Sequence, residues 1–218
     1  MPRMSRQLAD GLIYHVINRG NDKQVVFRKK WDYEVFLELM GMARERYPLK
    51  VFAYCLMPNH FHFVASQDGD ISLSSWIQWL MTTHVRRYNR HYERSGHLWQ
   101  GRFKSFPVQD DEHLLVLMRY VEGNPGRSGL VSTARDWKWS SHGENTGAVP
   151  RNLTDVAPRV LPENWTRYVD VPWTTSGLDC VRECVNRQAP FGSDVWRAKI
   201  SREFNLESTI RPRGRPRK

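Results

Sequence analysis

Cysteine is scarce in this 218-residue chain, which contains only Cys55, Cys180 and Cys184. No Cys-x-x-Cys pair is present, and three thiols cannot form a disulfide framework. The sequence therefore predicts neither a disulfide-stabilised protein nor a structural zinc site. Cys180 and Cys184 are four residues apart in a predicted helix, where they would lie on one face.

Long hydrophobic runs are also lacking. No apolar stretch approaches the roughly 18 residues that a membrane-spanning helix needs, and the first residues do not resemble a signal peptide. There is no internal repeat. These features predict a cytosolic protein that has no membrane partner.

Acidic residues are too few to balance the basic ones. Lys and Arg number 33 against 23 Asp and Glu, which gives a net charge of +10 and a pI near 9.8. This charge favours a polyanionic partner, of which nucleic acid is the commonest. The nine Trp, nine Phe and eight Tyr residues can fill a core, and some could stack on unpaired bases.

The order of predicted elements gives the fold class. Apolar periodicity and turn residues predict a strand, a helix, two strands, a helix, a strand or hairpin, and a helix, at 12–18, 30–46, 51–56, 60–66, 72–93, 97–106 and 110–123. This order is typical of an α+β, ferredoxin-like antiparallel sheet with helices packed on one face.

The C-terminal part has weaker periodicity. We expect a catalytic domain over 1–145, a linker over 146–175, a small helical extension over 176–210 and a basic tail over 211–218. The extension consists of two short predicted helices, 176–188 and 193–205, which the stretch 189–192 (APFG) separates.

The stretch 57–64 (MPNHFHFV) organises the chain. Pro58 cannot donate to a strand ladder, so a strand can begin only after it. Because side chains alternate along a strand, His60 and His62 share one face and Phe61 shares the other with Phe63. Two imidazoles on a rigid strand can bind one divalent metal, although the same pattern also fits an ordinary half-buried strand.

Near the end of the 110–123 helix, Tyr120 and Asn124 form an i, i+4 pair at the border of its apolar stripe. By itself, Tyr120 fits an amphipathic boundary residue with its hydroxyl in water. It also fits a nucleophile, with Asn124 as an oxygen ligand beside the histidines. His113 lies on the same flank and is a weaker candidate.

Three separated motifs carry a resemblance to a known family: 54–62 (YCLMPNHFH), 98–105 (LWQGRFKS) and 120–131 (YVEGNPGRSGLV). In order and wording they resemble the single-tyrosine HUH transposases, and among these the REP-associated tyrosine transposases of bacteria. The resemblance covers roughly 8–142. One departure is Glu122-Gly123, where an apolar residue is more usual in the family.

The resemblance implies a metal-dependent endonuclease and strand transferase acting on single-stranded DNA hairpins of repetitive extragenic palindromes. His60, His62 and Asn124 would hold Mg²⁺ or Mn²⁺, while Tyr120 attacks the phosphate and forms a 5′-phosphotyrosine. The ion or Lys104 would assist deprotonation of the tyrosine. The protein would be a monomer or homodimer associated with the bacterial nucleoid, acting either in mobilising DNA or in a domesticated role.

Basic residues outside the motif core predict the DNA contacts, although a solvated basic face would look the same. The candidates are Arg86, Arg87, Arg90, Arg102 and Lys104. The tail around Arg213 and Arg215 resembles an AT-hook, whose extended arginines fit the narrow minor groove of A·T-rich DNA.

Three other readings stay open at this point. Tyr88 and Tyr92 form an i, i+4 pair, which is the layout of HUH replication initiators with two nucleophiles. Alternatively, the chain is an inert module that binds DNA hairpins, or His60 and His62 serve a conventional metallohydrolase.

Overall fold

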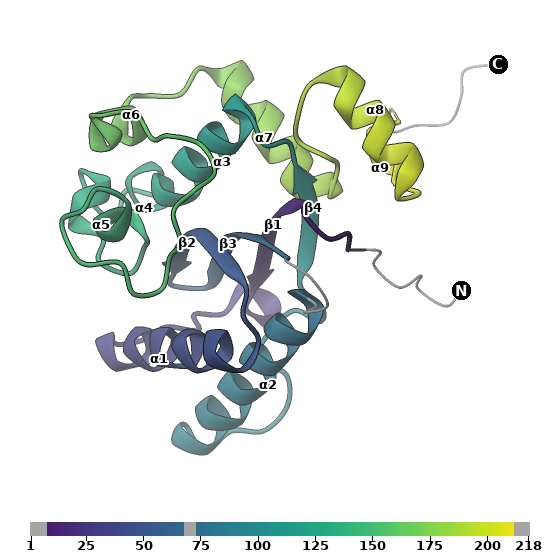
Figure 1. Ribbon diagram of the computed structural model, residues 1–218. Coiled ribbons are helices and arrows are strands. Elements are labelled where there is room, and N and C mark those ends of the chain that lie inside the picture. The colour runs from purple at the N-terminus through teal and green to yellow at the C-terminus, as the bar shows by residue number, and fades with distance from the viewer. Residues whose placement is uncertain (1–7, 68–72, 212–218) are drawn as a thin grey trace.

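A computed structural model describes residues 8–67 and 73–211 (Figure 1). The first residue of the helix predicted over 72–93, and Arg213 and Arg215 of the tail, lie outside the described residues. Within the described part, no helix is both long and apolar enough to cross a membrane.

The centre of the protein is a four-stranded antiparallel sheet with strand order β2-β3-β1-β4. The strands are β1 (Ile13–Arg19), β2 (Lys50–Met57), β3 (His60–Ser66) and β4 (Lys104–Val108). With α1 (Lys30–Arg46) between β1 and β2, and α2 (Leu73–His91) between β3 and β4, the chain has the ferredoxin-like order. The predicted α+β class and antiparallel sheet are confirmed.

Two of the predicted helices, α1 and α2, pack on one face of the sheet as expected, whereas the third, predicted over 110–123, packs on the other face. Phe61 and Phe63 of β3 point into this layer and are 0% exposed, together with Trp76 of α2. The Asp32 carboxylate accepts hydrogen bonds from the backbone N–H groups of Arg28 and Lys29, which fixes the first turn of α1.

The opposite face of the sheet is covered by α3 (Glu112–Glu122) and by elements that follow it (Figure 1). Asp111 caps α3 by accepting from the N–H of His113. The helix predicted over 110–123 ends at Glu122, and a second short helix, α4 (Asn124–Arg127), follows Gly123 directly. The site described below lies on this face.

The remaining elements are short. They are the 3-10 turns Asn21–Lys23 and Ala134–Asp136, and the helices α5 (His142–Asn145), α6 (Trp165–Asp170), α7 (Thr175–Arg187), α8 (Asp194–Glu203) and α9 (Glu207–Ile210). The two predicted C-terminal helices correspond to α7 and α8, whereas the sequence did not predict α6 or α9.

The segment 146–175, for which we expected a linker, contributes to the core. Trp165 and Val169 of α6 are each 3% exposed and pack in the layer that contains α3. Further along, Phe191 donates from its N–H to the Pro107 carbonyl and accepts from the N–H of Gln109. This contact covers the outer edge of β4, which would otherwise present unpaired backbone groups. The division of the chain at residue 145 stays a prediction.

Candidate functional site

The two histidines of β3 lie side by side on the α3 face of the sheet. Their ring centroids are 5.0 Å apart, and Phe61 between them is buried on the other face. The predicted alternation of the histidines and phenylalanines between the two faces of the strand is therefore confirmed. His60 is half-buried at the beginning of the strand, whereas His62 is 2% exposed.

Each histidine is held through its Nδ1 atom. The Nδ1 of His62 lies 2.8 Å from the Nε2 of His15, a residue of β1 that is 0% exposed. The Nδ1 of His60 lies 2.7 Å from the Oδ1 of Asn59. These contacts leave Nε2 of both His60 and His62 as the nitrogen that could bind a metal ion.

Burial keeps these imidazoles neutral. Burial, helped by the charge of Arg19, lowers the pKa of His60 to about 4, and it lowers the pKa of His15 to about 3. The pKa of His62 also falls well below its usual value, for the same reason and because several cations lie nearby. A neutral imidazole is the form that ligates metals.

Tyr120 of α3 lies next to this pair. Its ring meets the ring of His62 edge to face, with centroids 5.9 Å apart and planes at 85°, and the residue is 8% exposed. Asn124 begins α4 one turn later and is 9% exposed, and its Nδ2 is buried with no hydrogen-bond partner in the described part of the chain. Two imidazole nitrogens and an amide fit a divalent ion that also takes phosphate oxygen.

Cations surround the tyrosine. The Cζ of Arg127 lies 4.4 Å from the Tyr120 ring centroid, and Arg127 Nη2 donates to the Tyr120 carbonyl. Burial raises the pKa of Tyr120, while Arg127, Arg182 of α7 and Arg19 of β1 act in the opposite direction. A site whose charged neighbours are cations suits an anionic substrate.

Lys104 faces this site across the sheet. Ile17 pairs with His62 on one side and with Lys104 on the other, so His62, Ile17 and Lys104 form one row on the α3 face. The sequence could not predict this row because the strand register was unknown.

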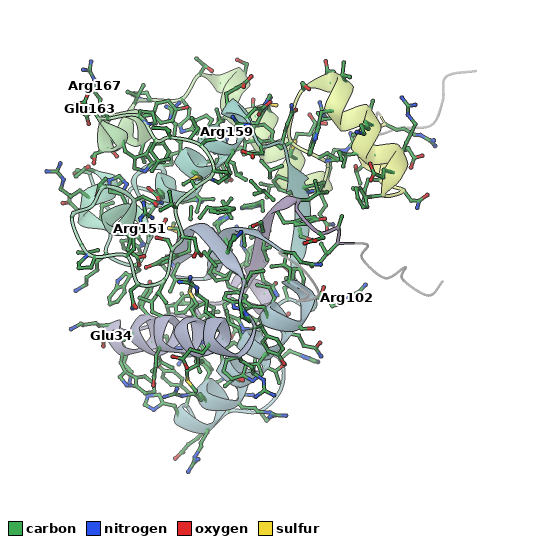
Figure 2. All side chains as sticks on the ribbon, viewed as in Figure 1. Glu34, Arg102, Arg151, Arg159, Glu163 and Arg167 are labelled. Carbon is green, nitrogen blue, oxygen red and sulfur yellow. The ribbon has the colours of Figure 1, made fainter. Side chains whose placement is uncertain are left out.

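The other predicted DNA-binding residues divide between two surfaces. Arg86 of α2 and Arg102 line a groove of about 940 Å³ between α2 and residues 97–103, on the opposite side of the sheet. Figure 2 shows the Arg102 side chain extending away from the ribbon beside α2. Arg87 instead pairs with Glu38 of α1 at 3.2 Å. Arg90 is exposed near the end of α2.

Tyr88 and Tyr92, the rival tyrosine pair, lie in the layer of α1 and α2, across the sheet from His62. The Tyr92 hydroxyl donates to Asp32 at 2.9 Å, and burial together with this bond raises the Tyr92 pKa to about 12. Tyr88 is 3% exposed. The structure does not bring this pair together with the histidines.

His113 is also separate from the pair. Its Nδ1 lies 2.7 Å from Asp111 Oδ1, and its ring packs against Phe191. Asp111, Glu112 and His113 could offer ligand atoms within 4.8 Å of one another. Asp111 is already the cap of α3, so this cluster has a structural explanation.

Sequence reasoning missed four residues of the site. They are His15, Arg19, Arg127 and Arg182, which lie on β1, α4 and α7. The sequence places His15 on a predicted strand between Tyr14 and Val16, but its contact with His62 depends on a strand register that was unknown. The position of Arg127, seven residues after Tyr120, was a weak signal, and nothing in the sequence indicated Arg182.

Comparison with known proteins identifies similar sequences. The family model described as "Transposase IS200 like" matches residues 9–124. A Haemophilus influenzae protein named as a REP-associated tyrosine transposase is 28% identical over 131 residues, which are 56% of this chain and 69% of that protein. The REP-associated tyrosine transposase of Escherichia coli K12 is 23% identical over 129 residues, or 58% of this chain and 68% of that protein.

A solved structure is similar in fold. It is a REP-associated tyrosine transposase bound to a REP hairpin, with a TM-score of 0.57 and 18% sequence identity. The match covers 74% of this chain and all of that one. At this identity the similarity concerns the arrangement of the sheet and helices.

Proposed function

Because the chain belongs to the family of IS200-like transposases, we propose that it is a site-specific endonuclease and strand transferase for single-stranded DNA. Its substrate is a palindromic REP hairpin, and Tyr120 is the nucleophile. The observation that carries this proposal is the edge-to-face contact of Tyr120 with His62, beside the Arg127 guanidinium.

The reaction would exchange one phosphodiester for another. The Tyr120 Oη loses its proton and forms a bond to phosphorus, and the bond from phosphorus to the 3′ oxygen breaks. The 3′ oxygen takes up one proton and leaves as a hydroxyl, so the step consumes no net proton. The downstream strand stays attached to the protein as a 5′-phosphotyrosine. Because the bond energy is retained, a 3′-hydroxyl can reverse the step and join strands.

Two features of the Tyr120 environment act on this attack in opposite directions. Burial raises its pKa and so disfavours the phenolate, whereas the guanidinium of Arg127 over the ring favours it. If Tyr120 attacks a phosphate, that phosphate must approach the residue against which the Arg127 guanidinium lies. The same charge that favours the phenolate therefore also attracts the substrate.

His60, His62 and Asn124 would hold the divalent ion, for which we propose Mg²⁺ or Mn²⁺. When bound, such an ion neutralises charge on the scissile phosphate and orients it for in-line attack. The two histidines supply their Nε2 atoms, since each Nδ1 is already engaged.

The DNA would contact both sides of the β1–β4 end of the sheet. Lys104 lies on the site face, and two residues earlier Arg102 lines the groove with Arg86. Leu98, Trp99 and Phe103 form the buried part of this groove, and the described residues that line it include no carboxylate. A basic rim with apolar walls suits unpaired nucleotides.

The choice of REP hairpins rests on the relatives. Two similar proteins carry the name REP-associated tyrosine transposase, and the protein of similar fold was solved with a REP hairpin. From the same resemblance we propose a nucleoid-associated, cytoplasmic location and a monomer or homodimer. Contact of the tail residues Arg213 and Arg215 with A·T-rich DNA is a further proposal, since they lie outside the described residues.

The deciding experiment is covalent trapping. A hairpin oligonucleotide labelled on the strand 3′ of the cleavage site is incubated with protein in Mn²⁺, Mg²⁺ or chelator, and the adduct is mapped by peptide mass spectrometry. We expect a metal-dependent adduct on Tyr120 that Tyr120→Phe abolishes and the matched control Tyr92→Phe retains.

Other outcomes would select the rival functions. An adduct on Tyr88 or Tyr92 would indicate a replication initiator. Cleavage that survives Tyr120→Phe and leaves no protein-linked DNA would indicate a metallohydrolase. Hairpin binding without cleavage in any metal, and unaffected by chelator, would indicate an inert DNA-binding module.

A further inference from the structure

Both candidate metal-binding histidines are engaged at the nitrogen that would not bind the ion. Neutral imidazole has one N–H donor and one acceptor nitrogen, so the partner on Nδ1 decides which form Nε2 takes. For His60 the partner is Asn59 Oδ1, and for His62 it is His15 Nε2. The neighbours of these histidines therefore influence whether the site can bind a metal at all.

The orientation of the Asn59 amide is fixed by a contact on its other side. Asn59 Nδ2 donates to the Lys23 carbonyl at 3.1 Å, so Oδ1 is the atom that faces His60. An amide oxygen only accepts, and His60 must therefore carry its proton on Nδ1 and keep the lone pair of Nε2. The turn that supplies Lys23 is itself held, because the N–H of Gly20 donates to the Asn59 carbonyl at 2.7 Å.

The His15–His62 contact allows two arrangements. If His15 donates, the His62 proton lies on Nε2 and His62 cannot ligate. If His62 donates from Nδ1, its Nε2 lone pair is free and the His15 proton lies on Nδ1. In the described structure the His15 Nδ1 is buried without a partner, beside the Phe106 ring at 4.8 Å between centroids.

We propose that His15 and Asn59 are positioning residues, which accept the Nδ1 protons of His62 and His60 and so leave both Nε2 lone pairs available to a metal ion. This inference rests on the proposed function, because it takes His60 and His62 as ligands. Metal-ligating histidines generally donate their second N–H to a fixed acceptor, and loss of that acceptor typically lowers metal affinity 10- to 100-fold. Here one acceptor is an amide and the other is a third imidazole.

The test measures metal affinity and ring protonation in the full chain. Mn²⁺ binding is titrated by calorimetry for the wild type, His15→Phe and Asn59→Leu, and we expect about 10- to 100-fold weaker binding in each variant. His15→Gln and Asn59→Asp keep an acceptor and should recover most of the affinity. His84→Phe is the matched control, because His84 is also buried and neutral but lies on the other face of the sheet.

Nitrogen-15 NMR of the imidazoles gives a second readout that needs no catalysis. In the Mn²⁺-free protein, Zn²⁺ serves as the diamagnetic probe, and His60 and His62 should carry their protons on Nδ1 when it is bound. The inference is overturned if His15→Phe and Asn59→Leu fold normally and bind Mn²⁺ within threefold of the wild type. If the wild type binds neither Mn²⁺ nor Zn²⁺, the metal site of the proposed function fails. The role of Asn59 would still be supported if His60 carries its proton on Nδ1 in the wild type and shares it between both ring nitrogens in Asn59→Leu.

Discussion

The Arg127 guanidinium stacks on the ring of Tyr120, with its Cζ 4.4 Å from the ring centroid, and donates a hydrogen bond to the carbonyl of the same residue. Burial lowers the pKa of Arg127 to about 10, which leaves it cationic at neutral pH. A fixed positive charge therefore lies against one face of Tyr120, the proposed nucleophile.

Removing this charge should slow cleavage. A cation over an aromatic ring contributes about 0.5–2 kcal/mol, so Arg127→Gln should lower the single-turnover cleavage rate about twofold to thirtyfold. The cleavage rate of this variant should also reach its maximum at a higher pH, because the Tyr120 phenolate loses a stabilising charge. Arg119→Gln is the control, since Arg119 stacks on Trp173 at 4.4 Å instead of on Tyr120. Equal rates and pH profiles for both variants would refute this role.

Gly123 provides the room for that arginine. A Cβ at this position would lie 2.8 Å from Arg127 Nη1 and 3.0 Å from the Arg119 carbonyl oxygen, which belongs to the backbone. Gly123→Ala should therefore displace Arg127 and lower the cleavage rate in the same direction as Arg127→Gln. Combining the two changes should add little, because both act through one contact. Fully additive losses would show that Gly123 acts independently of Arg127.

Glu122 should be essential for stability. Its Oε1 accepts from Ser141 Oγ and Asn145 Nδ2, and its Oε2 accepts from His142 Nδ1 and Trp165 Nε1 at 2.6 Å. Glu122→Gln places an NH₂ group against two of these donors. An unsatisfied buried donor costs about 1–3 kcal/mol, so urea unfolding should show a loss of at least about 2 kcal/mol.

The control for this prediction is Glu163→Gln. Glu163 lies at the surface near α6, where Figure 2 shows it at the periphery of the protein. Surface changes usually alter the free energy of unfolding by less than about 0.5 kcal/mol. A Glu122→Gln protein as stable as Glu163→Gln would mean that the four donors find other partners.

Acid should destabilise the protein through His84. Burial first, and the Arg87 charge second, lower the pKa of His84 to about 3. Between the unfolded value of about 6.5 and the folded value, the unfolded chain binds a proton that the folded protein does not. Stability is therefore lost as pH falls from 6.5 towards 3, by up to about 1.4 kcal/mol per pH unit.

Urea unfolding between pH 7 and pH 4.5 measures this effect. His84→Phe should reduce the slope of stability against pH by most of one proton, whatever it does to stability at pH 7. An unaltered slope in His84→Phe would indicate that His84 does not contribute.

Two adjacent arginines should differ in DNA binding. Arg86 lines the groove, whereas Arg87 is paired with Glu38. Each phosphate contact to a single strand contributes about 0.7 to the slope of log affinity against log salt. Arg86→Gln should reduce this slope for a hairpin with an unpaired flank, and Arg87→Gln should not. Fluorescence anisotropy across a salt series measures it, and equal slopes for the two variants would contradict the assignment.

Much of the sheet could be predicted because its signals are local. The bounds of α1 and β3 coincide with their predicted bounds, since Pro48 and Pro58 and the apolar periodicity mark them. α6 escaped prediction because it has six residues and gains its burial from Trp165, which contacts Glu122 from 43 residues away.

For the candidate site, the sequence predicted only which residues of one strand or one helix share a face. Alternation placed His60 and His62 on one face, and helical spacing paired Tyr120 with Asn124. His15 could not be assigned, because its contact with His62 depends on strand register across 47 residues. The sequence showed Glu122 only as a departure from the family pattern. Its role in the core could not be predicted, because its four hydrogen-bond donors lie 19 to 43 residues later in the chain.

The elements after residue 145 enclose part of Tyr120, the proposed nucleophile. Trp173 meets the Tyr120 ring edge to face at 6.2 Å, Arg182 of α7 acts on its pKa, and Trp165 of α6 holds the helix that carries it. A chain cut after residue 145 would therefore keep the histidines and the tyrosine but lose the side chains that enclose them. The smallest portion of the chain that keeps all three of these contacts extends into α7.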